Sequence, residues 1–328
     1  MMLTDLFGRV HDYLRISITD KCNLRCSYCM PYDLPHGYYA NIKRMTADEI
    51  YSIAKTFVGF GIKKIRITGG EPLMRKEFRK IIQLLAQLPV ELALSSNGVL
   101  IDDFMEDLQQ AKIKSVNISL DSLQAETFSS ITKRNEQERV LSNIHLLLKN
   151  NFEVKINTVV MRGINEQEIV NFVSLTKDLA LHIRFIEYMP FLGNGWHKNQ
   201  VFTYDEILST IGSVFSYTKL NDPVHSTSKN FKVNGYAGTF GIITTMSRPF
   251  CGDCNRLRLT ADGKMKNCLF DKEEIDLLSS LRNNDDITEL VLKSVRNKKA
   301  AMGGQFDNGY QQTEANQVIN RSMVGIGG

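Results

Sequence analysis

The sequence predicts an α/β fold, a six-unit partial barrel of the TIM type followed by a smaller α+β region. From Asp12 to about Tyr188, short β-branched runs alternate with longer amphipathic stretches, and after Pro190 this alternation stops. Strands separated by helix-length segments are typical of repeated β/α units around a parallel sheet. About eight such units close a full barrel, so six units predict an open one. We therefore expect one domain over residues 1–190 and a second over residues 191–328.

The parallel strands are expected where short runs of β-branched and apolar residues occur. These runs are Tyr13–Thr19, Lys64–Thr68, Glu91–Ser95, Ser115–Leu120, Glu153–Val160 and His182–Tyr188. Apolar residues at three- and four-residue spacing predict helices between the strands. The helices are expected over Ala47–Val58, Arg75–Leu88, Asp102–Ala111, Glu136–Asn150 and Asn165–Leu179. Ligands of such sheets bind beyond the carboxyl ends of the strands, where we expect the functional site.

The C-terminal region is expected to mix helices and antiparallel strands. Tyr204–Ile211 predicts a short helix, and Phe231–Thr245 alternates with glycines as paired strands do. Asn255–Leu269 predicts a hairpin that turns at Ala261-Asp262-Gly263-Lys264. A helix-rich tail follows and ends in Gly-Gly.

Composition excludes several classes of protein. The 328 residues are 43% hydrophobic and 23% charged, which is typical of globular chains and unlike disordered or fibrous ones. A formal net charge of +4 is too small to indicate nucleic-acid binding by itself. No apolar run approaches the roughly 18 residues of a membrane span, and charges interrupt the N-terminus. We expect a cytoplasmic protein without membrane or nucleic-acid partners.

Six cysteines form two groups of three, and the first group is a C-x3-C-x2-C motif of Cys22, Cys26 and Cys29. A disulfide framework is not expected in a long cytosolic chain, because its thiols are kept reduced. Three thiolates this close in sequence can hold one iron–sulfur cluster and leave one iron open for a substrate. Structural zinc is the alternative, but zinc normally takes a fourth protein ligand, which this loop does not clearly supply.

This loop, with Tyr28 before its last cysteine, resembles the signature of the radical S-adenosylmethionine (SAM) enzymes. Thr68–Pro72 (TGGEP) follows the second predicted strand, as the GGEP motif of that superfamily does. Its glycines allow the backbone to approach a ligand closely, and Glu71 can accept hydrogen bonds from an ammonium group. The resemblance implies a partial barrel of the radical SAM type, a first 4Fe-4S cluster on the three cysteines, and SAM on its open iron.

The second group, Cys251, Cys254 and Cys268, is a C-x2-C-x13-C motif whose predicted hairpin returns the third thiolate beside the others. Zinc ribbons use similar hairpins, but they need a fourth ligand and no cysteine remains. A second cluster with an open iron is favoured. Arg256 and Arg258 lie two residues apart and so share one face of a strand, where paired guanidiniums suit a polyphosphate.

Further cations lie along the predicted barrel strands, namely Arg15, Arg66, Lys155 and Arg184. A charge inside a barrel is costly to desolvate unless an anion or a ligand pairs with it. Each of these alone could be an outward, solvated side chain, but together they indicate an anion-binding cavity. The Lys298-Lys299 pair in the tail is expected on a solvated face.

The full set of motifs resembles one radical SAM family, the GTP 3′,8-cyclases of molybdenum-cofactor biosynthesis, from about Asp12 to Gly328. The resemblance implies that the C-terminal region, with a second 4Fe-4S cluster, closes the open side of the barrel. SAM would contact Tyr28, Gly70, Glu71, Ser119 and Met189. GTP would contact Arg15, Arg66, Ser95, Lys155, Arg184, Arg256 and Arg258. Gly327 and Gly328 would act as catalytic residues inside the active site, although an isolated terminal Gly-Gly is usually frayed.

The resemblance also implies the chemistry and the partners. Reductive cleavage of SAM would give methionine and a 5′-deoxyadenosyl radical, which would take hydrogen from C3′ of the GTP ribose. The ribosyl radical would attack C8 of guanine, and a further electron and proton would complete 3′,8-cyclo-7,8-dihydro-GTP. An external low-potential electron donor is implied, the downstream cyclic pyranopterin monophosphate synthase is an expected partner, and a homodimer stays open.

Two alternatives remain at the level of the sequence. A radical SAM peptide maturase also carries C-terminal auxiliary clusters, although such enzymes usually have more than the three C-terminal cysteines found here. A zinc-stabilised nucleic-acid-binding module is suggested by the C-x2-C hairpin and its arginines. Metal analysis distinguishes these classes, because two four-iron clusters correspond to about eight iron atoms per chain.

Overall fold

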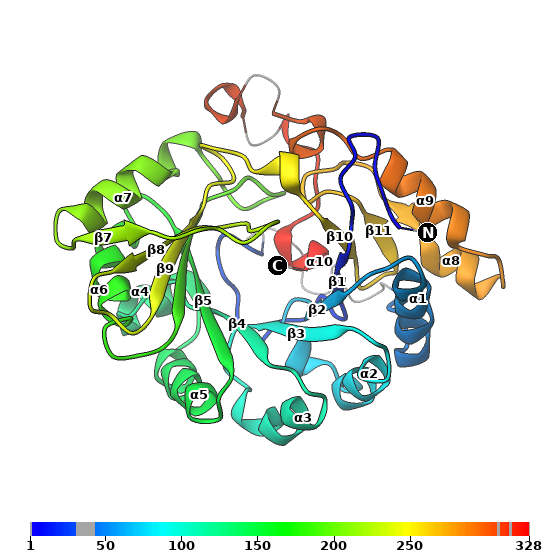
Figure 1. Ribbon diagram of the computed structural model, residues 1–328, viewed down its shortest axis with the longest axis horizontal. Coiled ribbons are helices and arrows are strands. Elements are labelled where there is room, and N and C mark those ends of the chain that lie inside the picture. The colour runs from blue at the N-terminus through cyan, green and yellow to red at the C-terminus, as the bar shows by residue number, and fades with distance from the viewer. Residues whose placement is uncertain (1, 31–42, 307–308, 315–316, 328) are drawn as a thin grey trace.

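The computed structural model describes residues 2–30, 43–306, 309–314 and 317–327. Six parallel strands form the centre of its sheet, which curves around the middle of the molecule with helices outside it (Figure 1). They are β1 (Tyr13–Ser17), β2 (Lys64–Thr68), β3 (Glu91–Ser96), β4 (Ser115–Ser119), β5 (Glu153–Val160) and β6 (His182–Glu187). The predicted strands are confirmed, and the bounds of β2 and β5 are those expected from the sequence.

Strands from the C-terminal region extend both edges of this sheet. β9 (Thr239–Ile243) pairs in parallel with β6, and β10 (Arg256–Leu259) pairs in parallel with β1. The outer strands are antiparallel to their neighbours: β7 (Tyr217–Lys219), β8 (Lys229–Val233), β11 (Lys264–Lys266) and β12 (Ile275–Asp276). The paired strands and the hairpin were expected, but their parallel attachment to the barrel was not. The domain boundary at residue 190 stays a prediction, because one sheet runs across it.

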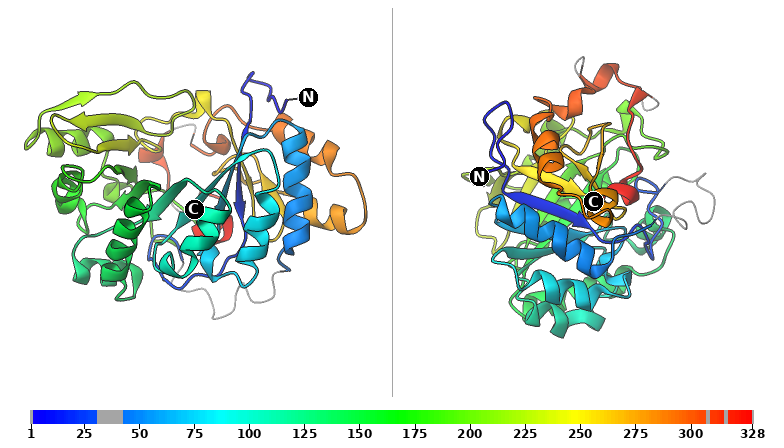
Figure 2. Two further views of the ribbon diagram at one scale, coloured as in Figure 1. Left: turned by 60° about the horizontal axis from the view of Figure 1, so that its bottom comes forward. Right: turned by 90° about the vertical axis from the view of Figure 1, so that its right-hand side faces the viewer.

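The helices lie mainly on the outer face of the sheet (Figures 1 and 2). The bounds are α1 (Ala47–Gly59), α2 (Phe78–Leu85), α3 (Met105–Gln110), α4 (Ala125–Thr132), α5 (Gln137–Lys149), α6 (Ile169–Ser174), α7 (Tyr204–Gly212), α8 (Leu277–Arg282), α9 (Thr288–Arg296) and α10 (Met323–Ile326). The sequence did not predict α4. The second and fifth predicted helices are longer than α2 and α6, because they include the short turns that flank these two helices. Among the described residues, no helix has the length and apolar character needed to cross a membrane.

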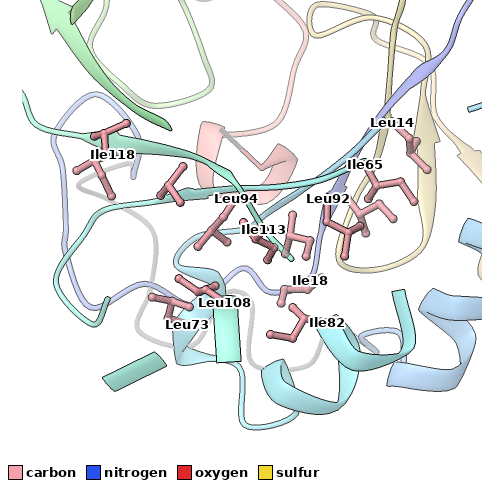
Figure 3. Packing of buried hydrophobic residues seen from close by; sticks show 14 of the residues in the cluster. Leu14, Ile18, Ile65, Leu73, Ile82, Leu92, Leu94, Leu108, Ile113 and Ile118 are labelled. Carbon is pink, nitrogen blue, oxygen red and sulfur yellow. The ribbon is translucent and has the colours of Figure 1, made fainter. Parts of the chain in front are cut away.

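Alternation along each strand separates an apolar outer face from a polar inner one. Figure 3 shows the outward residues packed against helix residues in the main core. The inward residues form rows across neighbouring strands, because paired residues in a sheet share a face. One row is Arg258, Arg15 and Arg66 on β10, β1 and β2. Another is Ser119, Asn157 and Arg184 on β4, β5 and β6. The interior of the barrel is therefore polar and cationic.

The C-terminal segment occupies the middle of this interior. α10 lies inside the curve of the sheet in Figure 1 and stays enclosed in the two views of Figure 2. Val324 and Ile326 are each 1% exposed. A segment that is buried to this degree is held in place by packing.

Candidate active site

Two adjoining cavities open inside the barrel, and each contains one group of cysteines. The first is lined by the three cysteines of the first motif and by residues at the carboxyl ends of the strands. The second is lined by the three cysteines of the second motif. Both cavities share Asn157, Ile186, Met189 and Met323 in their walls. The two cysteine groups therefore face one continuous interior, as the paired motifs predicted.

All six cysteines are free thiols. In the described part of the chain, no three His, Cys, Asp or Glu side chains converge closely enough to hold a single metal ion. Each cysteine group instead lines a wider opening. This arrangement fits a cluster of several metal atoms better than one tetrahedral zinc ion, whose ligands lie within about 2.3 Å of the metal.

The first cysteine loop is braced by the Gly-Gly turn after β2. Gly70 N donates to Thr19 O at 2.7 Å, and Glu71 N donates to Lys21 O at 2.7 Å. A Cβ atom on Gly70 would lie 2.4 Å from Lys21 O, so only glycine fits there. The sequence predicted that this glycine lets backbone approach a ligand. In the structure it lets two backbone segments approach each other, and Gly70 also lines the first cavity.

Glu71 does not line either cavity, which differs from its expected contact with SAM. The side chain is fully buried, and its carboxylate accepts hydrogen bonds from Leu73 N, Ser96 Oγ and Asn97 N at 3.1, 2.9 and 2.7 Å. Burial raises the pKa of Glu71 to about 7, although these donors oppose the shift. Its acceptor capacity is used within the protein, so we assign Glu71 to positioning the segment after β3.

That segment reaches the first cysteine loop through Asn97, which the sequence reading did not select as a site residue. Asn97 Nδ2 donates to Asn23 Oδ1 at 2.7 Å and to Cys22 Sγ at 3.7 Å. Burial, with a smaller contribution from Glu71, raises the pKa of Cys22 to about 12. The sequence signals at Asn97 were its place after a strand and its membership in Ser95-Ser96-Asn97-Gly98, one of the segments that resemble the GTP 3′,8-cyclases.

Tyr28 is held by the carboxylate of Asp121, which follows β4. Its hydroxyl donates to Asp121 Oδ2 at 2.8 Å, and Val159 N donates to Asp121 Oδ1 at 2.8 Å. Burial raises the pKa of Asp121 to about 6, against these hydrogen bonds. Tyr28, Ser119 and Met189, three of the residues expected to contact SAM, line the first cavity together.

The second cysteine group lies among cations. Lys298 Nζ donates to Cys254 Sγ at 3.4 Å, and Met302 N donates to Cys251 Sγ at 3.4 Å. Burial would raise the pKa of Cys254, but Arg256 and Lys298 outweigh it and lower that pKa to about 6. Lys298 is 3% exposed, so its expected place on a solvated face is wrong. The reason is that the chain turns inward after α9, which a charged pair in the sequence does not reveal.

The wall between the cysteine groups carries half-buried arginines that repel one another. Burial, with repulsion from neighbouring arginines, lowers the pKa of both Arg184 and Arg258 to about 9. Nε and Nη2 of Arg184 have no hydrogen-bond partner among the described residues. The same holds for Ser95 Oγ, Asn117 Oδ1 and Asn157 Oδ1. Buried polar atoms without partners indicate a bound group that satisfies them, because leaving them unpaired costs about 1–3 kcal/mol each.

The expected GTP residues divide between the two cavities. Arg15, Arg184, Arg256 and Arg258 line the second cavity, and Ser95 lines the first. Arg66 and Lys155 line neither, although both repel other cations of the interior. Arg66 Nε donates to the Tyr13 hydroxyl at 2.7 Å. Burial would raise the pKa of Tyr13, but Arg66 and Arg15 outweigh it and lower that pKa to about 7.

The C-terminal tail joins the two halves of the site. Val324 N donates to Cys29 O at 3.4 Å, and Arg258 Nη1 donates to Gly327 O at 3.0 Å. Gly327 has φ +88°, and a Cβ atom there would lie 2.6 Å from Thr68 Oγ1. The backbone at Gly327 therefore fits against β1 and β2 only without a side chain. Gly328, the other expected catalytic glycine, lies outside the described residues.

Comparison with known proteins identifies the family. Residues 16–176 match the radical SAM superfamily, and residues 181–303 match the family described as Molybdenum Cofactor Synthesis C. The GTP 3′,8-cyclase of Listeria welshimeri is 41% identical over 340 residues, which cover 100% of this chain and 99% of that relative. The chain belongs to the GTP 3′,8-cyclase family. This membership confirms the family resemblance of the sequence and makes the chain a radical SAM enzyme.

Other GTP 3′,8-cyclase relatives are longer. The mitochondrial GTP 3′,8-cyclase of Arabidopsis thaliana is 40% identical over 336 residues, covering 100% of this chain and 84% of the relative. Human molybdenum cofactor biosynthesis protein 1 is 41% identical over 330 residues, covering 98% of this chain and 50% of the relative. The chain therefore spans about half the length of several curated relatives that it matches.

A solved structure supports the fold of this GTP 3′,8-cyclase family member. Streptococcus suis SuiB bound to S-adenosylmethionine superposes with a TM-score of 0.61, covering 95% of this chain and 73% of SuiB. At 13% sequence identity this similarity concerns the fold alone. Together with the superfamily match, it confirms the predicted partial barrel of the radical SAM type.

Proposed function

We propose that this chain converts GTP to (8S)-3′,8-cyclo-7,8-dihydroguanosine 5′-triphosphate with SAM as cosubstrate, the first step of molybdenum-cofactor biosynthesis. The observation that carries the proposal is the cationic wall between the two cysteine groups. Arg15, Arg184, Arg256 and Arg258 line one cavity together with Cys251. Half-buried guanidiniums that converge on one cavity suit a triphosphate, because planar forks bind phosphate oxygens in a bidentate manner.

The residues present fit the two iron–sulfur clusters of the proposal. Cys22, Cys26 and Cys29 would hold the first 4Fe-4S cluster, and the second motif would hold the other. Three thiolates are one fewer than a four-iron cluster takes, so each cluster would keep one iron open. The first would face SAM beside Tyr28, Gly70, Ser119 and Met189, which share its cavity. The second would face the guanine base of GTP.

A 4Fe-4S cluster held by Cys22, Cys26 and Cys29 would supply the electron for cleavage of SAM, and the resulting 5′-deoxyadenosyl radical would take the C3′ hydrogen of GTP. The protein provides position and exclusion of water. Asn97 and Asp121 hold the first cysteine loop and Tyr28 in place. The arginines would fix the triphosphate so that C3′ points toward the first cavity. The buried tail, hydrogen-bonded to Arg258, would close the interior around the reacting atoms.

Tyr13 supplies a test of the proposed triphosphate wall, since its hydroxyl accepts from Arg66 Nε at 2.7 Å. Tyr13→Phe removes this acceptor and leaves Arg66 with the hydrogen bond from its Nη1 to Leu94 O at 2.6 Å, so the guanidinium is held less firmly. Hydrogen bonds to charged groups contribute about 1.5–3 kcal/mol, so we expect the Kd for GTP to rise roughly tenfold. Anaerobic equilibrium dialysis measures this. Tyr51→Phe, on α1 away from the cavities, is the matched control, and equal affinities of both variants would count against the wall.

Anaerobic reconstitution tests the proposed function as a whole. With GTP, SAM and a low-potential external reductant, we expect about eight iron atoms per chain and matched formation of 5′-deoxyadenosine and cyclised nucleotide. SAM cleavage without consumption of GTP would reject the substrate and favour a peptide maturase. Zinc as the sole metal would reject the radical mechanism. Adding the downstream cyclic pyranopterin monophosphate synthase to the assay tests whether that enzyme receives the product.

A further inference from the structure

Lys298 is a buried cation placed directly on a cysteine of the second group. The residue is 3% exposed, and its ammonium donates to Cys254 Sγ at 3.4 Å and to Arg256 O at 3.1 Å. Among the described residues, neither of its hydrogen-bond partners is a carboxylate. Burying a lysine without a carboxylate partner costs free energy. The buried position of Lys298 therefore indicates a function at the second cysteine group.

The segment that carries Lys298 is anchored from the other end of the sequence. Arg9 donates from Nη2 to Lys299 O at 2.8 Å and from Nη1 to Ala300 O at 2.7 Å. Arg9 Nη1 also donates to Cys251 O at 2.9 Å. The guanidinium of Arg9, whose side chain is 6% exposed, thus ties the Lys298 segment to the second cysteine loop. This anchoring keeps the ammonium of Lys298 against the sulfur.

The two cysteine groups lie in opposite electrostatic surroundings. A carboxylate lies beside the first group, where Asp121 accepts from the hydroxyl of Tyr28, the residue before Cys29. A cation contacts the second group directly, where the ammonium of Lys298 donates to Cys254 Sγ at 3.4 Å. Hydrogen bonds to the ligand sulfurs and nearby charge are among the factors that set the reduction potential of an iron–sulfur cluster.

We propose that Lys298 is a positioning residue for the second cluster, and that its hydrogen bond to Cys254 raises the reduction potential of that cluster. A buried positive charge beside a ligand sulfur stabilises the reduced, more negative cluster, and low dielectric strengthens the effect. The second cluster is then easier to reduce by one electron than it would be without Lys298. This inference rests on the proposed second cluster.

The test uses the full chain with Cys22, Cys26 and Cys29 replaced by alanine, so that the second motif carries the remaining cluster. Lys298→Met removes both charge and donor with little change in length, and Lys298→Gln keeps a neutral donor. Lys299→Met is the matched control, because the Lys299 side chain is exposed. Iron content and an anaerobic redox titration followed by electron paramagnetic resonance are measured for each protein.

We expect about four iron atoms per chain in the parent. Lys298→Met should lower the equilibrium constant for reduction at least tenfold, or about 59 mV for one electron. Lys298→Gln should show a smaller decrease, and Lys299→Met none. The role of Lys298 would be overturned if the reduction potentials of both Lys298 variants lay within about 30 mV of that of Lys299→Met. For one electron, this difference is about threefold in the equilibrium constant. If Lys298→Met loses its iron, the glutamine variant decides.

Two other outcomes separate this role from the proposed function. A parent protein without iron would overturn the second cluster, and with it the role of Lys298. Loss of iron from both Lys298 variants, with full iron in Lys299→Met, would overturn the proposed effect on the reduction potential. It would show that Lys298 is needed for assembly of the cluster.

Discussion

Replacing Gly70 by alanine is expected to reduce formation of 5′-deoxyadenosine from SAM by roughly a hundredfold or more. The new Cβ would lie 2.4 Å from Lys21 O and 2.7 Å from the carbonyl carbon of the same residue. Both are backbone atoms, so no side-chain rotation relieves the overlap. The loop that carries Cys22 must shift, and a misplacement of about 1 Å at a reacting centre costs on the order of a hundredfold in rate.

The measurement for Gly70→Ala is chromatographic detection of 5′-deoxyadenosine, together with iron content after reconstitution. Gly59→Ala is the matched control, because no described atom outside its own helix backbone and chain neighbours lies within 4 Å of a Cβ built at Gly59. That variant should cleave SAM as the unaltered chain does. Cleavage by Gly70→Ala within about threefold of the control would contradict the close contact between the Gly-Gly turn and the cysteine loop.

The second large effect is expected at the C-terminal tail. Gly327→Ala places a Cβ atom 2.6 Å from Thr68 Oγ1 and 2.8 Å from Ser17 Cβ, at a backbone φ of +88°. The tail must withdraw, and the hydrogen bond from Arg258 to Gly327 O is lost. We expect the cyclised nucleotide to fall by roughly a hundredfold while SAM is still cleaved, because positioning of GTP fails but the first site persists.

The ratio of cyclised nucleotide to 5′-deoxyadenosine measures this uncoupling. Deletion of Gly327 and Gly328 should give the same result as Gly327→Ala. In Gly212→Ala, a new Cβ meets its nearest atom, on the Tyr217 ring, at 3.6 Å, so the ratio should stay unchanged. Full cyclisation by the deletion variant would contradict the catalytic role proposed for the tail.

Much of the barrel could be predicted because its determinants are local. Short β-branched runs bounded by turns located all six central strands, and helical spacing located α1 and α5 within a residue or two. The alternation of side chains along a strand also placed Arg256 and Arg258 on one face, and both line the second cavity. Periodicity carries this information without reference to the rest of the fold.

The parts that sequence reasoning missed depend on contacts between distant segments. Nothing local in Arg256–Leu259 shows that this strand pairs with Tyr13–Ser17 at the start of the chain. The burial of Lys298 depends on an inward turn after α9. The carboxylate of Glu71 was expected to face a ligand, but Ser96 and Asn97, on and after another strand, occupy it. A motif therefore predicts that a residue belongs to the site, but it does not predict which partner that residue contacts.

These long-range contacts explain how one site is assembled from both ends of the chain. β10 carries its arginines to the edge of β1, and so places the second cysteine group across the interior from the first. Met323 on α10 lines both cavities. The proposed radical transfer needs this arrangement, because a radical formed near Tyr28 must reach a nucleotide held by Arg258.

The proposed function depends on transfer of hydrogen from C3′ of GTP to the 5′-deoxyadenosyl radical, and an isotope label follows this step. The reconstituted, reduced protein is incubated anaerobically with SAM and GTP that carries deuterium at C3′, and 5′-deoxyadenosine is analysed by mass spectrometry. We expect 5′-deoxyadenosine to gain one deuterium as the nucleotide is cyclised. Unlabelled 5′-deoxyadenosine, with the deuterium still in GTP, would show that the cationic interior does not present this ribose to the radical.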